Sequence, residues 1–194
     1  MKKMMLAAVL VLFTISAITA QTKWSLDKSH SKVQFTVSHL VITDVTGQFK
    51  SFDANILASK DDFSDAKVDF STDVNSIYTE NDKRDGHLKS DDFFNAEKFP
   101  KMTFVGNSMK KVGKNKYKLT GDFTIRDVTK KITLDVVYNG TIKDPWGNTK
   151  AGFKVTGAIN RFDYNLKWNV LTEAGGAVVG KTVYLTVDLE LNKA

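Results

Sequence analysis

The sequence of 194 residues contains no cysteine and only two prolines. A chain without cysteine forms no disulfide, offers no thiolate ligand to a metal, and has neither a lipid-modified cysteine nor a c-type haem attachment site. The sequence also lacks a Gly-x-Gly-x-x-Gly or phosphate-cradling loop and a Gly-x-Ser-x-Gly nucleophile turn. The usual sequence evidence for nucleotide binding and for hydrolase chemistry is therefore missing.

Only one run of residues is apolar enough to suggest a membrane, and it lies at the start of the chain. Two lysines precede an apolar segment over residues 4–13, and small residues follow as far as Ala20. This pattern is typical of a secretory signal peptide, and the segment is shorter than the ~20 residues that a membrane anchor needs. We predict a leader over residues 1–20, cleavage near Ala20, an exported protein in the periplasm or outside the cell, and a single domain over residues 21–194.

The basic residues do not form a nucleic-acid surface. The formal net charge is +6, and it falls to +4 without the two lysines of the leader. Lysines gather between Lys110 and Lys118 and at Lys130 and Lys131, but no aromatic residues alternate with them as a stacking surface for bases requires. We expect no nucleic-acid partner. Solvated turns and protected strand edges explain these clusters, and transient contact with an anionic membrane surface is the alternative.

Alternation of apolar and polar residues with a period of two predicts β-strands along most of the chain. The segment 66–75 shows it most clearly, and Gly47 is interpreted as a turn between the first two strands. Asn139-Gly140 is compatible with either a hairpin turn or a bulge inside a bent strand. The eight predicted strands cover residues 32–38, 52–56, 66–75, 102–105, 117–125, 132–138, 151–159 and 181–191.

Eight strands joined mostly by short turns predict an all-β protein with an eight-stranded antiparallel barrel. A barrel of this size either fills its interior with side chains or holds one small apolar ligand, and the pattern alone leaves both open. Small residues on the inward faces, such as Gly121 and Gly157, favour internal space. The candidate ligand-binding residues are Phe35, Val37, Phe52, Ile56, Val68, Phe70, Phe104, Phe123, Ile125, Leu134, Val136, Phe153, Val155 and Val187.

The segment 76–100 departs from the strand pattern and predicts a helical insertion. Thr79 is a candidate helix N-cap, with Glu80 and Asp82 in the first turn. Ser90, followed by two aspartates, is a candidate start for a second, shorter helix. We expect the insertion to cap or plug the barrel.

Charged residues in and after the insertion invite a catalytic interpretation, since a carboxylate beside an imidazole can orient a general base. Arg84, Asp85 and His87 are better explained as structural, because arginine and aspartate in such a plug tie it to the barrel by charge-assisted hydrogen bonds. Arg161 and Asp163 are interpreted as a brace at a strand end, with a surface ion pair as the alternative. We predict no catalytic residue and no cofactor.

Metal binding has no support in the spacing of the histidines. His30, His39 and His87 occur singly, without the i, i+4 spacing that places two imidazoles on one helix face. We therefore predict no metal site.

The motifs, taken together and in order, resemble the YceI-like family of secreted polyisoprenoid-binding proteins. They are WSLDKSHS at 24–31, RDGHL at 84–88, FPKMTF at 99–104, LTGDFTI at 119–125, DPWG at 144–147 and NRFDY at 160–164. The resemblance implies a lipocalin-like extended barrel whose apolar interior holds a long isoprenoid chain, such as a polyprenyl phosphate or the tail of an isoprenoid quinone. It also implies a bacterial protein that is exported and has no catalytic triad.

The working hypothesis is a protein that binds, stores or transports such a lipid. Burial of one methylene contributes about 0.8 kcal/mol, so an isoprene unit of five carbons gains roughly 3 to 4 kcal/mol on leaving water. Two alternatives stay open: an enzyme acting on a small apolar substrate, and a structural or interaction protein with a solid core. The sequence leaves open which lipid is bound and whether two barrels pair as a homodimer.

Overall fold

The structure, a computed structural model, describes residues 21–194, so the predicted leader lies outside the described residues. One α-helix, α1(Asp82–Lys89), and two 3-10 helices, η1(Val74–Ser76) and η2(Arg161–Tyr164), accompany the strands. The strands are β1(Thr22–Leu26), β2(Lys32–His39), β3(Thr43–Phe49), β4(Phe52–Ala58), β5(Lys67–Asp73), β6(Ile77–Tyr78), β7(Lys101–Gly113), β8(Lys116–Ile125), β9(Val128–Lys143), β10(Thr149–Asn160) and β11(Val179–Lys193). Across residues 21–194, no helix has the length and apolar character needed to cross a membrane.

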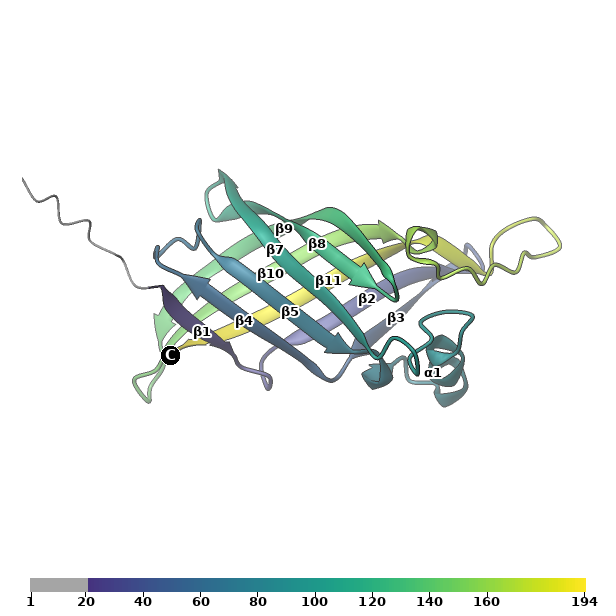
Figure 1. Ribbon diagram of the computed structural model, residues 1–194, viewed down its shortest axis with the longest axis horizontal. Helices are drawn as coiled ribbons and strands as arrows, with labels where there is room; N and C mark the ends of the chain where they lie inside the picture. Colours follow the sequence, from purple (N-terminus) through teal and green to yellow (C-terminus); the bar gives the residue numbers. More distant parts are fainter. Residues whose placement is uncertain (1–20) are drawn as a thin grey trace, which may run out of the picture.

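All strands belong to one antiparallel sheet that closes on itself (Figure 1). β1 and β2 act as one interrupted strand, because β11 pairs with both, and β4 and β3 pair with them on the other side. β5 and β6 likewise act as one interrupted strand, because β5 pairs with β4 and β6 pairs with β3. Counted this way the meander has eight long strands, and the pairing of β1 with β11 completes the ring. The predicted eight-stranded antiparallel barrel with one helical insertion is confirmed.

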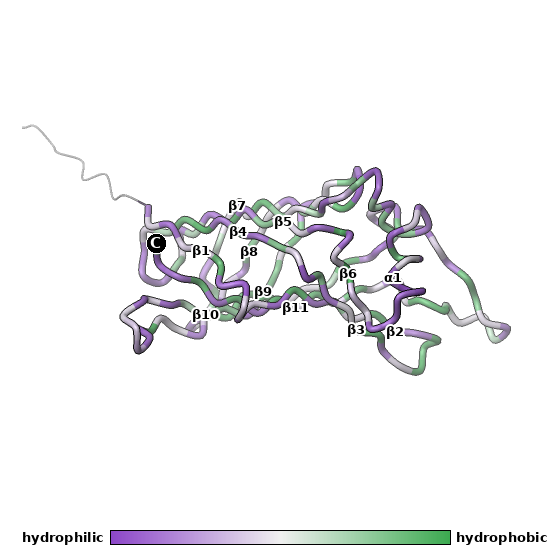
Figure 2. Tube along the Cα trace, turned by 90° about the horizontal axis from the view of Figure 1, so that it is seen from below, coloured by the Kyte–Doolittle hydropathy of each residue, from purple (hydrophilic) through white to green (hydrophobic). Residues whose placement is uncertain are grey.

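The alternation of residue type separates the interior of the barrel from its outer surface. Along β11 the apolar residues turn inward into the core, and they are Val183, Leu185, Val187, Leu189 and Leu191. On the outer face neighbouring strands pair polar side chains, as where Thr120 and Thr133 hydrogen-bond at 2.9 Å and Lys118 meets Asp135 at 2.6 Å. Cross-strand pairs of this kind stabilise a sheet on its wet side. Figure 2 shows the result as alternating hydrophobic and hydrophilic segments along the strands.

The structure corrects the turn predicted at Gly47 and decides between the hairpin and the bulge at Asn139-Gly140. Gly47 does not form a turn but lies inside β3, directly opposite Phe35. A Cβ at this position would collide with the Phe35 ring, so glycine is needed for close packing rather than for a change of direction. Gly140 has a φ of +119° within β9, where Asn139 is the extra residue opposite the Gly152–Phe153 step of β10. Asn139-Gly140 is therefore a β-bulge.

Two glycines in the barrel wall do not leave the space that the sequence led us to expect, whereas Ala54 and Ala66 do line a cavity inside the barrel. A Cβ added to Gly121 would meet the Val105 carbonyl oxygen and lie 2.5 Å from Cζ of Phe104, while one added to Gly157 would collide with Leu134. Large side chains of neighbouring strands therefore cover these glycines. The expectation of free volume at the glycines is wrong, because a missing Cβ is used to seat a ring or an isobutyl group.

Aromatic side chains close one end of the barrel. Phe63, in the loop between β4 and β5, is 2% exposed. Its ring lies 4.9 Å from the rings of Trp24 and Phe153 and 5.4 Å from that of Tyr138, measured between centroids. Such tilted and edge-on contacts are favourable beyond the area that they bury.

The helical insertion closes the opposite end of the barrel, where Figure 1 shows α1 beside the ends of the strands. The helix begins later than predicted: Asn81, not Thr79, is the N-cap, and its side chain accepts a hydrogen bond from the Arg84 amide at 2.9 Å. Glu80 has a φ of +62° and cannot lie in a right-handed helix. Residues 91–98 form turns instead of the predicted second helix, and Ser90 is the C-cap of α1.

The packing of Gly121 makes a testable prediction about stability. Gly121→Ala is expected to reduce the free energy of unfolding by about 1–3 kcal/mol, because the new methyl group overpacks the Phe104 ring. Gly152→Ala is the matched control, since its nearest neighbour would be Asn139 Cβ at an ordinary 3.5 Å. Urea titrations of both variants measure the difference. Equal stability of the two would contradict the packing described for Gly121.

Candidate ligand-binding site

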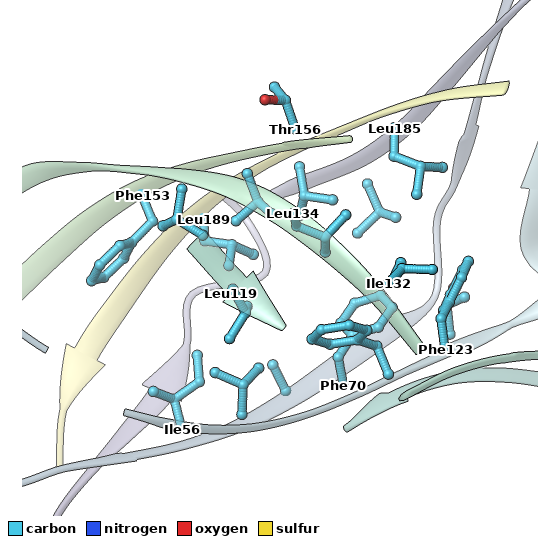
Figure 3. A pocket seen from close by; sticks show the side chains of 18 of the residues that line it. Ile56, Phe70, Leu119, Phe123, Ile132, Leu134, Phe153, Thr156, Leu185 and Leu189 are labelled. Carbon is cyan, nitrogen blue, oxygen red and sulfur yellow. The ribbon is translucent and has the colours of Figure 1, made fainter. Parts of the chain in front are cut away.

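A cavity of about 130 Å³ lies inside the barrel and receives side chains from nearly every strand. Figure 3 shows Ile56, Phe70, Leu134 and Phe153 around a common space. The labelled side chains carry only carbon atoms, apart from Thr156 at the edge of the view. The period-two pattern of the strands produces this surface, because it turns one apolar residue inward at every second position.

A second cavity, of about 80 Å³, lies at the α1 end of the barrel. The insertion covers it with Leu88, Phe93 and Phe94, and Leu166 joins them from the segment after η2. Ile125 belongs to the barrel wall. The end of the interior is thus built from residues far apart in the sequence.

A partition of five side chains separates the two cavities. These residues line both spaces, and they are Phe35, Phe49, Met102, Phe123 and Leu185. The Phe35 and Phe49 rings lie 5.7 Å apart between centroids. Any ligand that extends through both cavities must displace part of this partition, and methionine, with its unbranched flexible side chain, is the member most easily moved.

Both cavities expose only apolar atoms on their walls. A polar or charged group placed inside would lose its hydrogen bonds to water and find no partner, which costs several kcal/mol or more. Apolar cavities of this kind stay dry and accept hydrocarbon, and an engineered cavity of about 150 Å³ accepts benzene. The larger cavity therefore has room for one group of roughly that size before any side chain moves.

Thirteen of the fourteen predicted ligand-binding residues line one of the two cavities. They are Phe35, Val37, Ile56, Val68, Phe70, Phe104, Phe123, Ile125, Leu134, Val136, Phe153, Val155 and Val187. Phe52 is buried in the core but lines neither cavity. Whether these side chains contact a ligand stays a prediction.

Sequence reasoning missed several residues of the same surface. Phe49 lies in β3, a strand that the sequence analysis did not include, and Phe63 follows two aspartates in a loop. Phe63 also has a φ of +58°, which no pattern predicts for phenylalanine. Met102 and Leu119 lie in predicted strands and in phase with chosen residues, so the alternation was sufficient to find them.

Asp85 and His87 do not face each other as a catalytic pair would. The buried Asp85 carboxylate accepts hydrogen bonds from the amide and hydroxyl groups of Thr79, to which Arg84 also donates. His87 instead pairs with Asp92 at 2.8 Å. Since Thr79 directly follows β6, Arg84 and Asp85 hold α1 to the end of a strand, in agreement with a structural role.

Arg126, in the turn between β8 and β9, ties the insertion across the end of the barrel. Its guanidinium group donates to the carbonyl oxygens of Asp91, Phe93 and Asn165 at 2.9–3.1 Å and to the Asp91 carboxylate at 2.8 Å. A planar guanidinium suits such a fork of acceptors. The sequence predicts only a turn at Arg126, and nothing in the local pattern indicates this role.

Arg161 is the predicted brace, but its partners differ from those expected. Its guanidinium donates to the carbonyl oxygens of Leu166, Trp168, Val179 and Gly180 at 2.7–3.1 Å, and the residue is 3% exposed. Within residues 21–194 all of its hydrogen bonds go to carbonyls, and no ion pair joins it to Asp163. Burial lowers the pKa of this side chain. Because the walls of the smaller cavity are wholly apolar, Arg161 contributes its hydrocarbon stem to the lining and not its charge.

Comparison with known proteins identifies the family. The family model for the YceI-like domain matches residues 24–191. The chain belongs to the YceI-like family. A UPF0312 protein of Staphylococcus aureus (strain MSSA476) is 38% identical over 172 residues, which cover 88% of this chain and 98% of that protein.

Solved structures of YceI-like proteins have the same fold. The Campylobacter jejuni YceI protein is 36% identical and superposes with a TM-score of 0.69, over 87% of this chain and 96% of that one. A polyisoprenoid-binding domain from Saccharophagus degradans, 18% identical, superposes with a TM-score of 0.65 over 88% of this chain and 98% of that chain. At that identity the second comparison shows the barrel fold alone.

In this YceI-like chain a polar cluster lies where β1 meets β11. Asp27, His30 and Glu190 place their ligand atoms within 4.8 Å of one another, a grouping that the sequence did not reveal. Lys150 already pairs with both carboxylates, with its Nζ 2.9 Å from Asp27 and 2.7 Å from Glu190. The ammonium group satisfies the carboxylates and would repel a metal ion, so the cluster is a structural ion-pair network.

Removal of the Arg126 tie is expected to loosen the insertion. Arg126→Ala leaves the carbonyls of Asp91 and Phe93 without their donor, so amide hydrogen exchange at Phe93 to Asn95 should become about tenfold faster or more. Arg126→Lys keeps the charge but not the planar fork, and should give an intermediate rate. Exchange mass spectrometry measures both. Rates equal to those of the unaltered protein in Arg126→Ala would exclude this role.

The Asp27 cluster predicts a dependence of stability on pH. Hydrogen bonds from Ser29, Lys150 and His30 hold the pKa of Asp27 well below its ordinary value near 3.8. A lowered pKa in the folded state means that the stabilisation is complete above pH 4 and is lost as the pH falls further, when the carboxylate must take up a proton. Lys150→Met should reduce the slope of the unfolding free energy against pH between pH 4 and 2. The reduction corresponds to up to about one proton. Unchanged acid titrations would contradict this contribution.

Proposed function

We propose that this protein binds the hydrocarbon tail of a long-chain isoprenoid lipid and carries or stores that lipid between membranes. The observation that carries the proposal is a closed barrel containing two wholly apolar cavities in series. Membership of the YceI-like family supports it, as does the similar fold of a domain described as polyisoprenoid-binding. Polyprenyl phosphates and isoprenoid quinones are the lipids of this class that the proposal includes.

The apolar walls determine which part of the lipid can be inside. A methyl-branched tail gains about 0.8 kcal/mol for each methylene group that leaves water. A phosphate or quinone head finds no donor on the cavity walls and stays outside or at the α1 end. The barrel is therefore selective for the tail and tolerant of the head.

The length of the tail requires movement of the partition. Each cavity in its present form accepts a group of only a few carbons. Displacement of Met102 and of the Phe35 and Phe123 rings joins the two cavities into one tunnel, because these side chains line both. The cost of rearranging them, together with the ordering of the tail, keeps the affinity far below the full transfer free energy of the chain.

Binding rather than catalysis is consistent with the polar groups near the cavities. Asp85, His87, Arg126 and Arg161 all make hydrogen bonds within the protein scaffold. The buried hydroxyl of Tyr164 has no hydrogen-bond partner among residues 21–194, and burial raises its pKa to about 12, so it is not poised for proton transfer near neutral pH.

Export belongs to the same proposal. A protein that moves a lipid tail through water is needed in a compartment bounded by membranes, and the predicted leader over residues 1–20 would deliver it to the periplasm or the outside of the cell. N-terminal sequencing of the protein recovered from a periplasmic fraction checks cleavage near Ala20.

A variant that fills the cavity tests the proposal directly. Ala54→Leu adds three carbons to the wall of the larger cavity and should lower the affinity for geranylgeraniol about tenfold or more, while stability is unchanged or raised. Val105→Leu, on the exposed outer face of β7, is the matched control. Thermal shift and native mass spectrometry measure binding. If the unaltered protein neither binds the prenyl alcohol nor gains melting temperature, the proposal fails.

A further inference from the structure

Two loops at the α1 end of the barrel expose aliphatic side chains to solvent. Leu40, Val41 and Ile42 in the turn between β2 and β3 are 39%, 70% and 84% exposed, and Val170 and Leu171 in the loop before β11 are 48% and 58% exposed. These five residues are called the apolar tip below. Figure 1 places both loops at the end where α1 lies, and the turn between β2 and β3 is hydrophobic in Figure 2.

Hydrogen bonds hold the two loops together as one surface. The Leu40 amide donates to the Val178 carbonyl at 2.9 Å, and the Val178 amide donates to the Val170 carbonyl at 2.9 Å. A Cβ added to Gly176 would lie 3.2 Å from Val41 Cγ2, so the loops also pack side by side. The apolar tip is therefore a fixed protrusion of the barrel end.

The turn between β2 and β3 has a backbone conformation that is unfavourable for the residues in it. Leu40 and Val41 have φ values of +52° and +65°. Hairpin turns with two successive positive φ values favour Asn-Gly, and a β-branched residue in this region is strained. The aliphatic side chains thus occupy positions where less apolar residues would fit the backbone better, which points to a use for the side chains themselves.

The apolar tip continues the wall of the smaller cavity. Val37 lies three positions before Leu40, Val179 lies directly after the second loop, and both line that cavity. Val179 of β11 pairs with His39 of β2, so the two strands are neighbours at this point. The same two strands therefore lead from the exposed tip into the apolar interior.

We propose that the apolar tip inserts into the interface of a lipid bilayer and sets the α1 end of the barrel against the membrane. This inference rests on the proposed function, because a tail taken from a membrane must enter the barrel without crossing water. The tip protrudes and contains only leucine, valine and isoleucine, which transfer favourably into a bilayer. It lacks the tryptophan, tyrosine and arginine that dominate binding at protein interfaces.

Charge plays little part in this contact. Across residues 40–43 and 169–178 the only charged side chain is that of Glu173. Binding to vesicles of zwitterionic phosphatidylcholine should therefore be nearly independent of salt, in contrast to attraction of the lysine clusters by anionic lipid.

The absence of native cysteine allows a direct measurement of insertion. Ile42→Cys is labelled with an environment-sensitive nitrobenzoxadiazole dye, and phosphatidylcholine vesicles are added. The emission of the dye should shift to shorter wavelength and rise in intensity. Ile142→Cys, 70% exposed near the end of β9 at the opposite end of the barrel, is the matched control and should not respond.

Two sets of variants separate the role of the side chains from folding. Ile42→Asp and Leu171→Asp should each reduce the vesicle-bound fraction about tenfold, while Ile142→Asp leaves it unchanged. Leu40→Asn combined with Val41→Gly relieves the strained turn, so it should raise or preserve the melting temperature and still weaken binding to vesicles.

The outcomes distinguish this inference from the proposed function. If tip variants bind geranylgeraniol added without vesicles but no longer extract prenyl lipid from vesicles, both proposals are supported. A dye response at residue 142 instead of residue 42 would overturn the inference, as would equal effects of tip and control variants. A response at residue 42 that depends on protein concentration and needs no vesicles would assign the tip to protein contacts and overturn it also. If the unaltered protein does not bind geranylgeraniol, the proposed function is refuted instead.

Discussion

Pairing between β1 and β11 is the constraint on which the interior of the barrel depends. It joins the first described strand to the last, over Trp24 to Leu26 and residues 191–193. Together with the longer pairing of β2 with β11, it removes the two free edges that the meander would otherwise have and so keeps the apolar face from water. The ion pairs of Lys150 with Asp27 and Glu190 lie beside the seam. Charge-assisted bonds thus reinforce the contact with the largest separation in sequence, which is also the contact that is entropically most costly to form.

Once the ring is closed, the balance between packing and space is determined by a few large side chains. Phe104 covers Gly121 and Leu134 covers Gly157, and these pairs fill volume that the sequence predicts to be free. The space that remains is divided by the partition around Met102. The aromatic rings of this interior pack on one another, and the rotatable side chains of the partition give a line along which it can open.

The sequence predicted the barrel well because alternation with a period of two is a local signal, and each strand repeats it. It predicted poorly wherever a residue acts through a distant partner. Gly47 looked like a turn because its reason for being glycine is Phe35 on the neighbouring strand. Phe63 and Arg126 lie in loops, and only the closed ring brings them to the ends of the interior. Motif resemblance supplied the family, yet it did not show that Arg161 binds carbonyls instead of Asp163.

Buried aromatic rings close both ends of the barrel, and at the α1 end the hydrogen bonds of Arg126 are added to them. To open the end at Phe63, a nearly buried ring must leave Trp24 and Phe153 for water, at a cost of roughly 2–3 kcal/mol before the lost aromatic contacts are added. To open the other end, the buried Phe93 ring must likewise leave Trp168 for water, and the hydrogen bonds of Arg126 to the insertion are exchanged for hydrogen bonds to water, a replacement with a small net free energy for each bond. Under the proposed function the tail enters at the α1 end, beside the apolar tip, and its leading carbons come to rest against the rings around Phe63 at the other end.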